Sequence, residues 1–428
     1  MVVELEPPPS PKGLAAAEAH EAATRWVRGS LSGLYLESEG SEIASDQFVG
    51  GHSAAYQRLS EFDCSGYGSK RGNVYPTTKR GASRLSPYIR HGIITLKEVY
   101  LWTEKHCSDF DRDRFRSELL WQEYARHLYF FYGRGLRRPY RYRPKDPVCS
   151  TSTAEYFEDE EMLCIKEVYG ELVRSGYIVN QSRMWLASHA TVRHRKDWLE
   201  GEEIFFRHLV DGSRAANRLG WQWVAGYATG RPYGFSQSQV ARYAPRLCAK
   251  CSLKSTCPIQ FWPETYEVVM AEPIARYDHL VKEMEEMVSA RVEPSDVAWI
   301  TAENLGLYQE VLRLPRKEVL FIFDEPLLRK LQISSKRLIF IAQTLGEIQE
   351  YYSNLRVFRG DPTDLLKDRE VDTCYSPVPL WRRYAKSAQL RNVYPYPWLR
   401  EPKENEPLSS FSRWRSYLER GDRASRRN

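Results

Sequence analysis

The chain has 428 residues, of which 42% are hydrophobic and 28% are charged. This size and balance are typical of a globular protein with two or three domains, and they exclude a disordered or low-complexity chain. The formal net charge of +6 is compatible with a polyanionic partner such as nucleic acid, although a charge of this size does not require one.

The apolar runs and the cysteines indicate the cellular compartment in which the protein is expected. No run of about 18 apolar residues is present, so the sequence predicts no membrane-spanning segment and no membrane partner. Residues 1–11 contain three consecutive prolines and have neither a basic start nor an apolar run, so we expect no secretory signal. The eight cysteines then favour a reducing compartment, where clustered thiols bind metals more often than they form disulfides. We therefore expect a cytoplasmic protein, or a nuclear or organellar one in a eukaryote.

The first part of the chain has helical patterning. Apolar residues recur at helical spacing over residues 13–30, and a Gly- and Ser-rich, charged stretch follows at 38–80. Beyond it the pattern stays mostly helical to about Met287. These patterns predict an N-terminal helical segment and connector at residues 1–80 and an all-helical domain at 81–290.

The pattern changes near Pro294. Short apolar runs predict three buried strands, at 297–301, 319–323 and 355–358. A helical pattern separates the last two, and alternation of strand, helix and strand is typical of a Rossmann-like parallel α/β sheet. The predicted fold class is therefore α/β plus all-α, with the α/β domain at residues 291–428.

Five segments of the helical part combine the features that chemistry on a buried flavin needs, which are a pocket for the ring, a charge near it and aromatic side chains that pass electrons. They are Tyr67 to Arg71, Ser83 to Gly92, Glu118 to His127, Gly176 to Met184, and Trp198 to Trp223. In order and spacing these segments resemble the flavin-binding core of the photolyase and cryptochrome family. The resemblance implies an all-helical FAD-binding domain.

The resemblance also implies which residues hold FAD. They are Tyr67, Arg71, Ser83, Arg84, Leu85, Ser86, Gln122, Arg183, Asp211 and Asn217. In the family, the segment that matches Ser83 to Ser86 binds the flavin diphosphate, and hydroxyls suit phosphate oxygens. Arg183 is expected to pair with Asp211, and Asn217 matches the position next to the flavin N5. Ala82 stands where the family has Thr, and Gln122 where many members have Arg.

A second set of residues is implied to take part in catalysis. They are Glu118, Trp121, Asn180, Met184, Trp198, Trp221 and Trp223. In family members that repair cyclobutane pyrimidine dimers, the residues matching Glu118 and Trp121 contact the lesion. Trp221 and Trp198 match the inner and middle tryptophans of the electron-transfer chain of the family. We find no surface tryptophan that completes this chain. A tyrosine, or the cysteine site described next, is the alternative for the outer position.

Three thiols lie within ten residues of each other, at Cys248, Cys251 and Cys257, and Pro258 follows the third. A Cys-x-x-Cys pair with a later Cys-Pro is frequent in iron–sulfur sites. The spacing resembles that of the iron–sulfur bacterial cryptochromes and photolyases, whose fourth ligand lies upstream, where Cys164 stands. The resemblance implies a 4Fe–4S cluster on these four cysteines. A zinc ion and unliganded thiols remain alternatives.

The order of the domains differs from that of the family. There an α/β antenna domain comes first and leads into the helical domain, whereas here similar segments, at 297–301, 321–324 and 356–362, follow the flavin core. Residues 394–399 and 410–414 resemble the exit of that antenna domain. The sequence therefore predicts a circular permutant with a possible antenna chromophore of unknown identity. An unrelated α/β domain is the alternative.

The function implied by the resemblance is that of a light-driven, FAD-dependent deoxyribodipyrimidine photo-lyase. Its partner would be UV-damaged DNA, with the damaged nucleotides flipped into a pocket and an electron supplied by excited reduced flavin. Cyclobutane dimers are the expected lesion, and Asn217 favours repair because many plant-type cryptochromes carry Asp there. A cryptochrome-type blue-light receptor, a (6-4) photolyase and a flavin-free DNA-binding protein remain alternatives. We expect a monomer.

Overall fold

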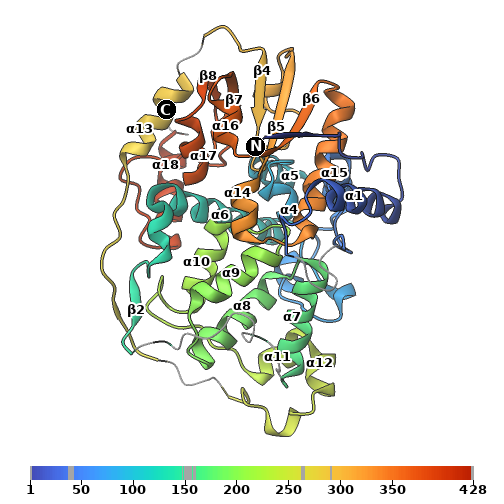
Figure 1. The fold of residues 1–428 in the computed structure, drawn as a ribbon. Helices are drawn as coiled ribbons and strands as arrows, with labels where there is room; N and C mark the ends of the chain where they lie inside the picture. The colour runs from blue at the N-terminus through green and yellow to red at the C-terminus, as the bar shows by residue number, and fades with distance from the viewer. Residues whose placement is uncertain are drawn as a thin grey trace.

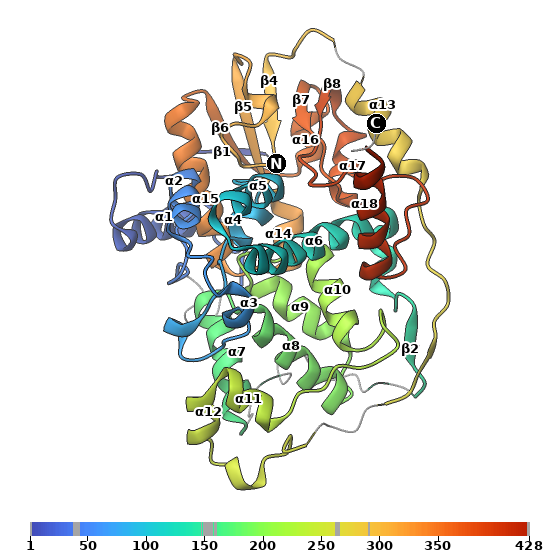
Figure 2. The same cartoon turned by 180° about the vertical axis from the view of Figure 1, so that it is seen from behind.

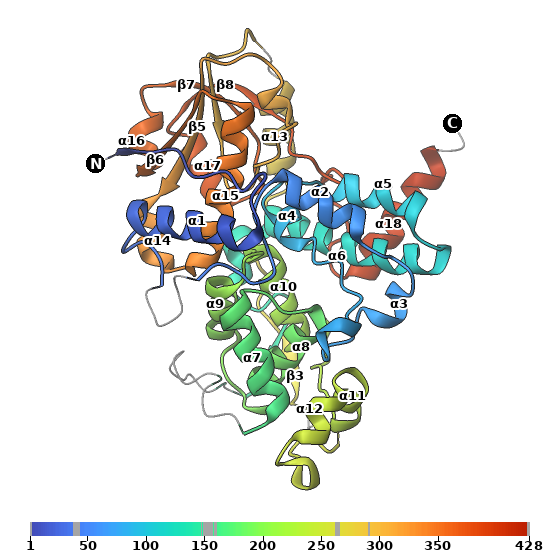
Figure 3. The ribbon, with the colours of Figure 1, turned by 90° about the vertical axis from the view of Figure 1, so that its right-hand side faces the viewer.

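The structure is a computed structural model that describes residues 2–36, 43–146, 148, 157, 161–261, 266–289 and 292–425. A helical body forms one end of the molecule and a β-sheet with its helices forms the other (Figure 1). Helices α11 and α12 lie at the end farthest from the sheet (Figure 3). Within the described ranges, no helix is both long enough and apolar enough to cross a bilayer.

The helical body contains the segments that carry the flavin-type motifs. Its helices, with those of the N-terminal segment, are α1 (Ala16–Ser30), α2 (His52–Glu61), α3 (Tyr67–Lys70), α4 (Ser86–Arg90), α5 (Leu96–His106), α6 (Asp109–Tyr132), α7 (Leu163–Ser175), α8 (Asn180–Ser188), α9 (Trp198–His208), α10 (Arg214–Val224), α11 (Gln237–Tyr243) and α12 (Pro245–Lys250). The next helix, α13 (His279–Ser289), packs against the last strand of the sheet. Side-chain caps fix several starts: Thr95 precedes α5, Ser108 precedes α6 and Ser213 precedes α10, and each accepts a hydrogen bond from a backbone N–H of its helix. A short ladder joins β2 (Tyr142–Pro144) to β3 (Val268–Met270).

The main sheet has six strands in the order β1-β6-β5-β4-β7-β8. They are β1 (Val3–Leu5), β4 (Val297–Ile300), β5 (Glu318–Asp324), β6 (Leu355–Gly360), β7 (Glu370–Cys374) and β8 (Gln389–Tyr394). Strands β4 to β8 pair in parallel, which confirms the predicted parallel α/β sheet. The strand β1 was not predicted, and it pairs antiparallel with β6, with Val3 opposite Arg359. Its three residues are too few to show a strand period, so only the exposed edge of β6 selects them.

The second half of the chain also contains α14 (Glu325–Leu331), α15 (Ser335–Tyr351), α16 (Pro362–Leu366), α17 (Pro379–Ala385) and α18 (Phe411–Ser425). Of these, α15 and α17 lie on opposite faces of the sheet, because successive residues of a strand point to opposite faces. Accordingly, Phe321 of β5 packs in one core cluster with α15, and Leu320 packs in another with Trp381 of α17. The C-terminal helix α18 leaves the sheet and packs against α6 (Figure 2).

Helix α15 joins the two halves, and every residue from Ser335 to Ile348 is buried. Its polar side chains reach the other half of the molecule. Gln343 accepts a hydrogen bond from the backbone N–H of Gly50 at 2.8 Å. Arg337 donates through Nε to the carbonyl oxygen of Leu209 at 2.9 Å, and through Nη2 to that of Phe206. A buried polar group is stable only when it is bonded in this way, so these contacts hold α15 in one register.

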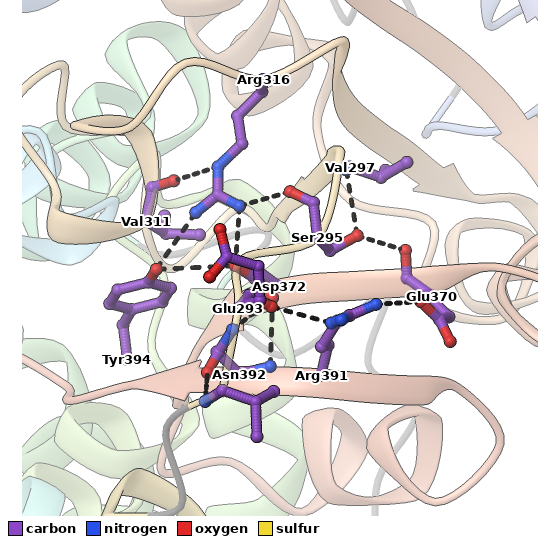
Figure 4. A network of polar contacts seen from close by, with 11 residues as sticks. Glu293, Ser295, Val297, Val311, Arg316, Glu370, Asp372, Arg391, Asn392 and Tyr394 are labelled. Carbon is purple, nitrogen blue, oxygen red and sulfur yellow. Dashed lines mark hydrogen bonds and ion pairs between the residues drawn. The ribbon is translucent and has the colours of Figure 1, made fainter.

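A buried ion pair lies at the amino ends of the strands. Arg316 precedes β5 and Asp372 lies on β7, and their Nη1 and Oδ2 atoms are 2.7 Å apart in side chains that are 2% and 0% exposed. Arg316 also donates to the carbonyl oxygen of Ser295, and Asp372 accepts from Asn392 of β8 (Figure 4). The network therefore ties the starts of β4 and β5 to residues within β7 and β8.

The cysteines differ in part from the expectation for a reducing compartment. Cys64 and Cys107 form a disulfide bond, which the sequence analysis did not predict. They are separated by 43 residues, so no clustering marked them as partners. The pair is brought together because the turn before α3 lies against the junction of α5 and α6, where Asp111 accepts hydrogen bonds from the N–H groups of Gly66 and Gly68.

We predict that Asp372→Asn lowers the free energy of unfolding by about 3–5 kcal/mol, because it leaves the buried Arg316 guanidinium without its counter-charge. Unfolding in urea measures the change. The matched control is Asp296→Asn, which removes the 2.7 Å contact with Lys317 from side chains that are 63% and 79% exposed. That control should cost less than about 1 kcal/mol. Equal losses of unfolding free energy in the two variants would contradict the larger contribution of the buried ion pair.

Candidate functional site

A cavity of about 1140 Å³ lies where the helical body meets the sheet. Its walls come from α3, α4, α6, α8, α9 and α10, with α14 and the start of α17 at one end. Small-molecule sites usually measure about 300–1000 Å³, so this cavity has room for a large cofactor.

Most residues expected to hold the cofactor line this cavity. They are Tyr67, Arg71, Ser83, Arg84, Ser86, Gln122, Arg183, Asp211 and Asn217. Leu85 does not line it. It is 1% exposed and packs into the core behind the wall, because the turn that presents Ser83 and Ser86 directs the intervening apolar side chain inward.

Most of the residues expected to take part in catalysis also line the cavity, and one does not. Glu118, Trp121, Asn180, Met184, Trp221 and Trp223 line the cavity. Trp198 does not, and its side chain is buried in the core behind α9. Any role of Trp198 is therefore exercised through another residue and not by contact with a ligand in the cavity.

The expected ion pair between Arg183 and Asp211 is present on the cavity wall. Nη2 of Arg183 lies 2.8 Å and 3.0 Å from the two carboxylate oxygens of Asp211. The Ser86 hydroxyl donates to Oδ2 of the same carboxylate at 2.6 Å. Charge-assisted hydrogen bonds of this kind are stronger and more directional than neutral ones, so α4, α8 and the turn before α10 are held in a fixed geometry around the cavity.

Glu118 of α6 forms an ion pair with Arg71, next to α3. Burial raises the pKa of the Glu118 carboxyl, and the positive charge of Arg71 opposes this rise. The two residues were assigned to separate tasks from the sequence, Arg71 to the cofactor and Glu118 to the substrate. In the structure they form one unit, so a change in either residue affects the other.

Asn217 of α10 presents an unsatisfied amide to the cavity. The residue is 5% exposed, and among the described residues its Nδ2 atom has no hydrogen-bond acceptor. A buried donor without a partner costs about 1–3 kcal/mol. Such a group is a natural place for an acceptor atom of a ligand.

Trp221 packs against the backbone of α9. It is 1% exposed, and a Cβ atom built on Gly201 would lie 2.0 Å from its Cη2 atom. Trp198 is three residues before Gly201 on the same helix, so it lies on the same face one turn away. Both tryptophans therefore lie at the same face of α9, although only Trp221 reaches the cavity.

Trp121 is in part covered by the C-terminal helix. Its ring stacks on that of Phe411, with centroids 3.9 Å apart and planes inclined by 15°. The sequence analysis expected Trp121 to contact the lesion. Trp414 of the same C-terminal helix is fully buried, and Phe411 takes one face of Trp121. Trp121 also lines the cavity.

Other lining residues were not predicted from the sequence. They include Arg90, Tyr129, Arg214, Arg218, Glu303, Lys330, Pro377 and Val378. Glu303, Lys330 and Pro377 follow β4, β5 and β7, so this end of the cavity lies at the carboxyl ends of parallel strands. The strand order reverses between β4 and β7, which is where ligands bind in open α/β sheets. In the sequence, only the turn signal at Pro377 could have indicated that this end of the cavity exists.

Arg218 of α10 is a buried cation that also lines the cavity. It is 4% exposed, and burial lowers the pKa of its guanidinium. Its Nε atom lies 4.0 Å from Glu202, while Nη1 has no hydrogen-bond partner in the part of the chain that the structure describes. Burial also raises the pKa of Glu202 to about 7, which weakens it as a counter-charge. The part of the cavity around Arg218 therefore suits an anionic group.

The four predicted metal ligands converge on a second, small and apolar cavity. Cys164 of α7 faces Cys248, Cys251 and Cys257, which lie in and after α12. Burial and the neighbouring thiols raise the pKa of Cys164 to about 12, and burial raises that of Cys248 as well. Over the described ranges, no group of three or more His, Cys, Asp or Glu side chains has the arrangement for a metal ion. The thiols are thus assembled, but without a metal-binding geometry.

Comparison with known proteins points to one family. Residues 168–245 match the family described as the FAD binding domain of DNA photolyase. The chain is 31% identical to the deoxyribodipyrimidine photo-lyase of Synechococcus sp. over 189 residues, which are 41% of this chain and 38% of that protein. It is 27% identical to the enzyme of the same name from Agrobacterium fabrum over 235 residues, 51% of this chain and 47% of that protein. It is 24% identical to the cryptochrome DASH of Idiomarina loihiensis over 226 residues, 48% of each.

Solved structures of the same kind are also similar. A cryptochrome of Synechocystis sp. matches with a TM-score of 0.42 and 21% identity, over 47% of this chain and 45% of that one. The archaeal photolyase of Sulfolobus tokodaii matches with a TM-score of 0.41 and 24% identity, over 53% and 54%. The chain spans about half or less of the length of the curated relatives that it matches. The sequence matches support the photolyase and cryptochrome family and its FAD-binding domain, and they do not separate photolyase from cryptochrome.

We predict that Gly201→Ala lowers the free energy of unfolding by about 1–3 kcal/mol, because the added methyl group overlaps the ring of Trp221 and neither can move freely. Denaturant unfolding followed by tryptophan fluorescence measures this loss. Gly170→Ala on α7 is the control, since nothing lies within 4 Å of the added atom. It should be neutral or stabilising by up to about 1 kcal/mol. If Gly201→Ala behaves like the control, the packing of Trp221 on α9 is wrong.

Proposed function

We propose that this chain is a light-driven, FAD-dependent photolyase of the photolyase and cryptochrome family, acting on pyrimidine dimers in UV-damaged DNA. One observation carries the proposal. Segments that resemble the flavin core of that family are spread over more than 150 residues, from Tyr67 to Trp223, yet most of the side chains expected to act in them line a single cavity of about 1140 Å³. An accidental likeness of sequence would not bring them to one place.

The cavity residues fit the parts of FAD. The Ser83 and Ser86 hydroxyls and the Arg84 guanidinium suit the diphosphate. Arg84 has a φ of 55°, which is costly for a residue other than glycine and occurs most often at ligand sites. The unsatisfied amide of Asn217 would donate to the flavin ring, and the Arg183–Asp211 pair would hold the pocket around it. When bound, FAD would supply light absorption and one-electron transfer.

Side chains at the mouth of the cavity would hold the damaged bases. Burial raises the pKa of Glu118, which favours the protonated carboxyl that can donate a hydrogen bond to a base carbonyl. When Glu118 is ionised, Arg71 keeps it in position. Trp121, Met184 and Trp223 provide apolar surfaces against which a flipped base can stack. Cyclobutane dimers are the proposed lesion, with the (6-4) lesion as the alternative.

A second chromophore is proposed for the compartment at the carboxyl ends of β4, β5 and β7. An antenna pigment with an anionic group would suit Arg218 and Arg214 there, and the compartment is continuous with the proposed flavin pocket. Which pigment binds would follow from extraction of the purified protein.

The order of the domains is proposed to be a circular permutation. The flavin domain at 81–290 would precede the antenna-type domain at 291–428, and the segment 1–80 adds β1 to the edge of the later sheet. At the other end of the chain α18 docks on α6, so the terminal segments connect the two halves (Figures 1 and 2). A rearranged order is tolerated where chain ends lie at a surface.

A 4Fe–4S cluster is proposed on Cys164, Cys248, Cys251 and Cys257. Four thiols face one cavity, as a cluster with one cysteine on each iron needs. A single zinc ion on the same thiols is the alternative. The cluster would also remove the burial penalty of ionised thiols.

The function is tested by photorepair. We predict that the purified protein contains FAD and that, after chemical reduction and in blue light, it restores dimer-containing DNA. Glu118→Ala should retain FAD and lose about 10- to 100-fold in repair rate, which is the value of one charged hydrogen bond in the transition state. Glu104→Ala, which removes the partner of Arg116 outside the cavity, is the control and should repair normally.

A yellow protein that neither repairs dimers nor prefers dimer-containing DNA over intact DNA would contradict the photolyase proposal. It would favour the alternative of a cryptochrome-type receptor. A protein without any flavin would exclude both.

The cluster is tested by metal analysis after anaerobic purification. We predict about four iron atoms per chain with broad visible absorption, both lost in Cys257→Ser. Cys374→Ser is the control, because Cys374 is a buried free thiol outside the small cavity. One zinc ion per chain, or no metal at all, would contradict the cluster.

A further inference from the structure

The ring of Trp121 lies between the cavity and the C-terminal helix. Trp121 lines the cavity, whereas Phe411, the first residue of α18, does not. The Phe411 ring, which stacks on Trp121, therefore covers it from outside the cavity. Tyr124, one turn later on α6, meets the edge of the indole, with centroids 5.8 Å apart and planes inclined by 81°. The indole is thus held on one face and one edge, and the face on the cavity side is left for a ligand.

The segment that leads into α18 is anchored by hydrogen bonds to its backbone. The hydroxyl of Tyr124 donates to the carbonyl oxygen of Leu408. The hydroxyl of Tyr140, which precedes β2, donates to the same oxygen at 2.9 Å. Both donors of the carbonyl of Leu408 come from the helical body, and Leu408 is three residues before Phe411. The start of α18 is therefore fixed relative to α6.

A buried carboxylate fixes the same segment a second time. Nδ1 of His127 on α6 lies 2.6 Å from Oε1 of Glu406, in side chains that are 0% and 1% exposed. The other oxygen of Glu406 accepts a hydrogen bond from the indole Nε1 of Trp414 on α18 at 3.2 Å. One carboxylate thus contacts both helices, and a satisfied buried network of this kind makes an arrangement rigid. Because Trp414 lies one turn after Phe411, the first turn of α18 is held in place.

A ring that is held before binding favours the ligand that stacks on it. Ordering a side chain on binding costs free energy, and a side chain that is already ordered avoids this cost. An aromatic ring can stack on any base, whichever hydrogen-bonding edge the base carries. The free face of Trp121 therefore decides where a flipped base lies. That face looks into the cavity, which Glu118, one turn earlier on α6, also lines.

We propose that Phe411 is a positioning residue of the substrate site, which holds the ring of Trp121 so that a flipped base stacks on its cavity face alone. This inference rests on the proposed function, because the base is that of a damaged dinucleotide in DNA. Phe411 does not touch the substrate and acts only through Trp121. The C-terminal helix thereby completes a site whose other walls come mainly from the helical body.

The test compares three changes at Phe411. Phe411→Ala removes the ring, Phe411→Leu keeps an apolar side chain without a planar face and serves if the alanine variant fails to fold, and Phe411→Tyr keeps the ring. Each full-length protein is titrated in the dark with dimer-containing and with intact DNA, and repair is measured over a range of DNA concentrations. The matched control is His106→Ala, which removes a ring stacked on Trp102 at a centroid distance of 4.3 Å, away from the cavity.

We expect Phe411→Ala and Phe411→Leu to bind dimer-containing DNA about 3- to 10-fold more weakly, because the ring of Trp121 must then be ordered on binding. KM for repair should rise by the same factor, while kcat and the affinity for intact DNA stay unchanged. Phe411→Tyr and His106→Ala should behave as the unaltered protein. A general loss of structure would instead lower both affinities together.

The orientation of Trp121 is measured without DNA by ¹⁹F NMR on protein labelled with 5-fluorotryptophan. The chain has 12 tryptophans, and the signal of Trp121 is the one that is lost in Trp121→Phe. We expect one sharp signal from Trp121 in the unaltered protein and in Phe411→Tyr. The signal should shift and broaden in Phe411→Ala and Phe411→Leu, because the ring then samples several rotamers.

Three results would overturn the positioning role and leave the photolyase proposal standing. They are a Trp121 signal that is unchanged in Phe411→Ala, full affinity of Phe411→Leu for dimer-containing DNA, and equal weakening of the binding of both DNAs. An unaltered protein with no preference for dimer-containing DNA and no repair would overturn the proposed function, and the role of Phe411 in the substrate site with it, whatever the signal of Trp121 shows.

Discussion

The buried guanidinium of Arg337 on α15 is the contact on which the geometry of the cavity depends. It donates to the carbonyl oxygens of Phe206 and Leu209 at the carboxyl end of α9. Burial lowers its pKa to about 9, so it still carries a positive charge at neutral pH. A Cβ atom on Gly212 would lie 1.9 Å from Nη2, so the turn between α9 and α10 closes directly over this group. That turn carries Asp211.

The polar cavity wall follows from this turn. Asp211 binds Arg183 of α8 and Ser86 of α4, and the next residues start α10, which carries Asn217 and Trp221. Because α15 packs on the sheet and caps a helix of the other half, the two halves cannot separate without exposing Arg337. The cavity and the proposed antenna compartment are therefore consequences of one interface. The buried network at the amino ends of the strands stabilises the sheet from its far side.

Local periodicity explains which parts of the site could be predicted. Glu118 and Trp121 are three residues apart on one helix, and Asn180 and Met184 are four apart on another, so each pair shares a face whatever the tertiary structure. Each pair does line the cavity. Leu85 and Trp198 belong to equally recognisable motifs, but their side chains point into the core. A motif identifies a segment, whereas the direction of one side chain within it depends on what packs against the segment.

The sequence by itself determined the helical and α/β patterning, the five flavin-type motifs and the four clustered cysteines, because these rest on spacing along the chain. Only the tertiary structure decided that β1 pairs with β6, that Cys64 meets Cys107 and that Phe411 covers one face of Trp121. Each of these contacts joins residues far apart in sequence, and no local preference encodes the partner. The burial of Arg218 was decided in the same way, since a buried charge carries a cost only once the folded chain has closed around it.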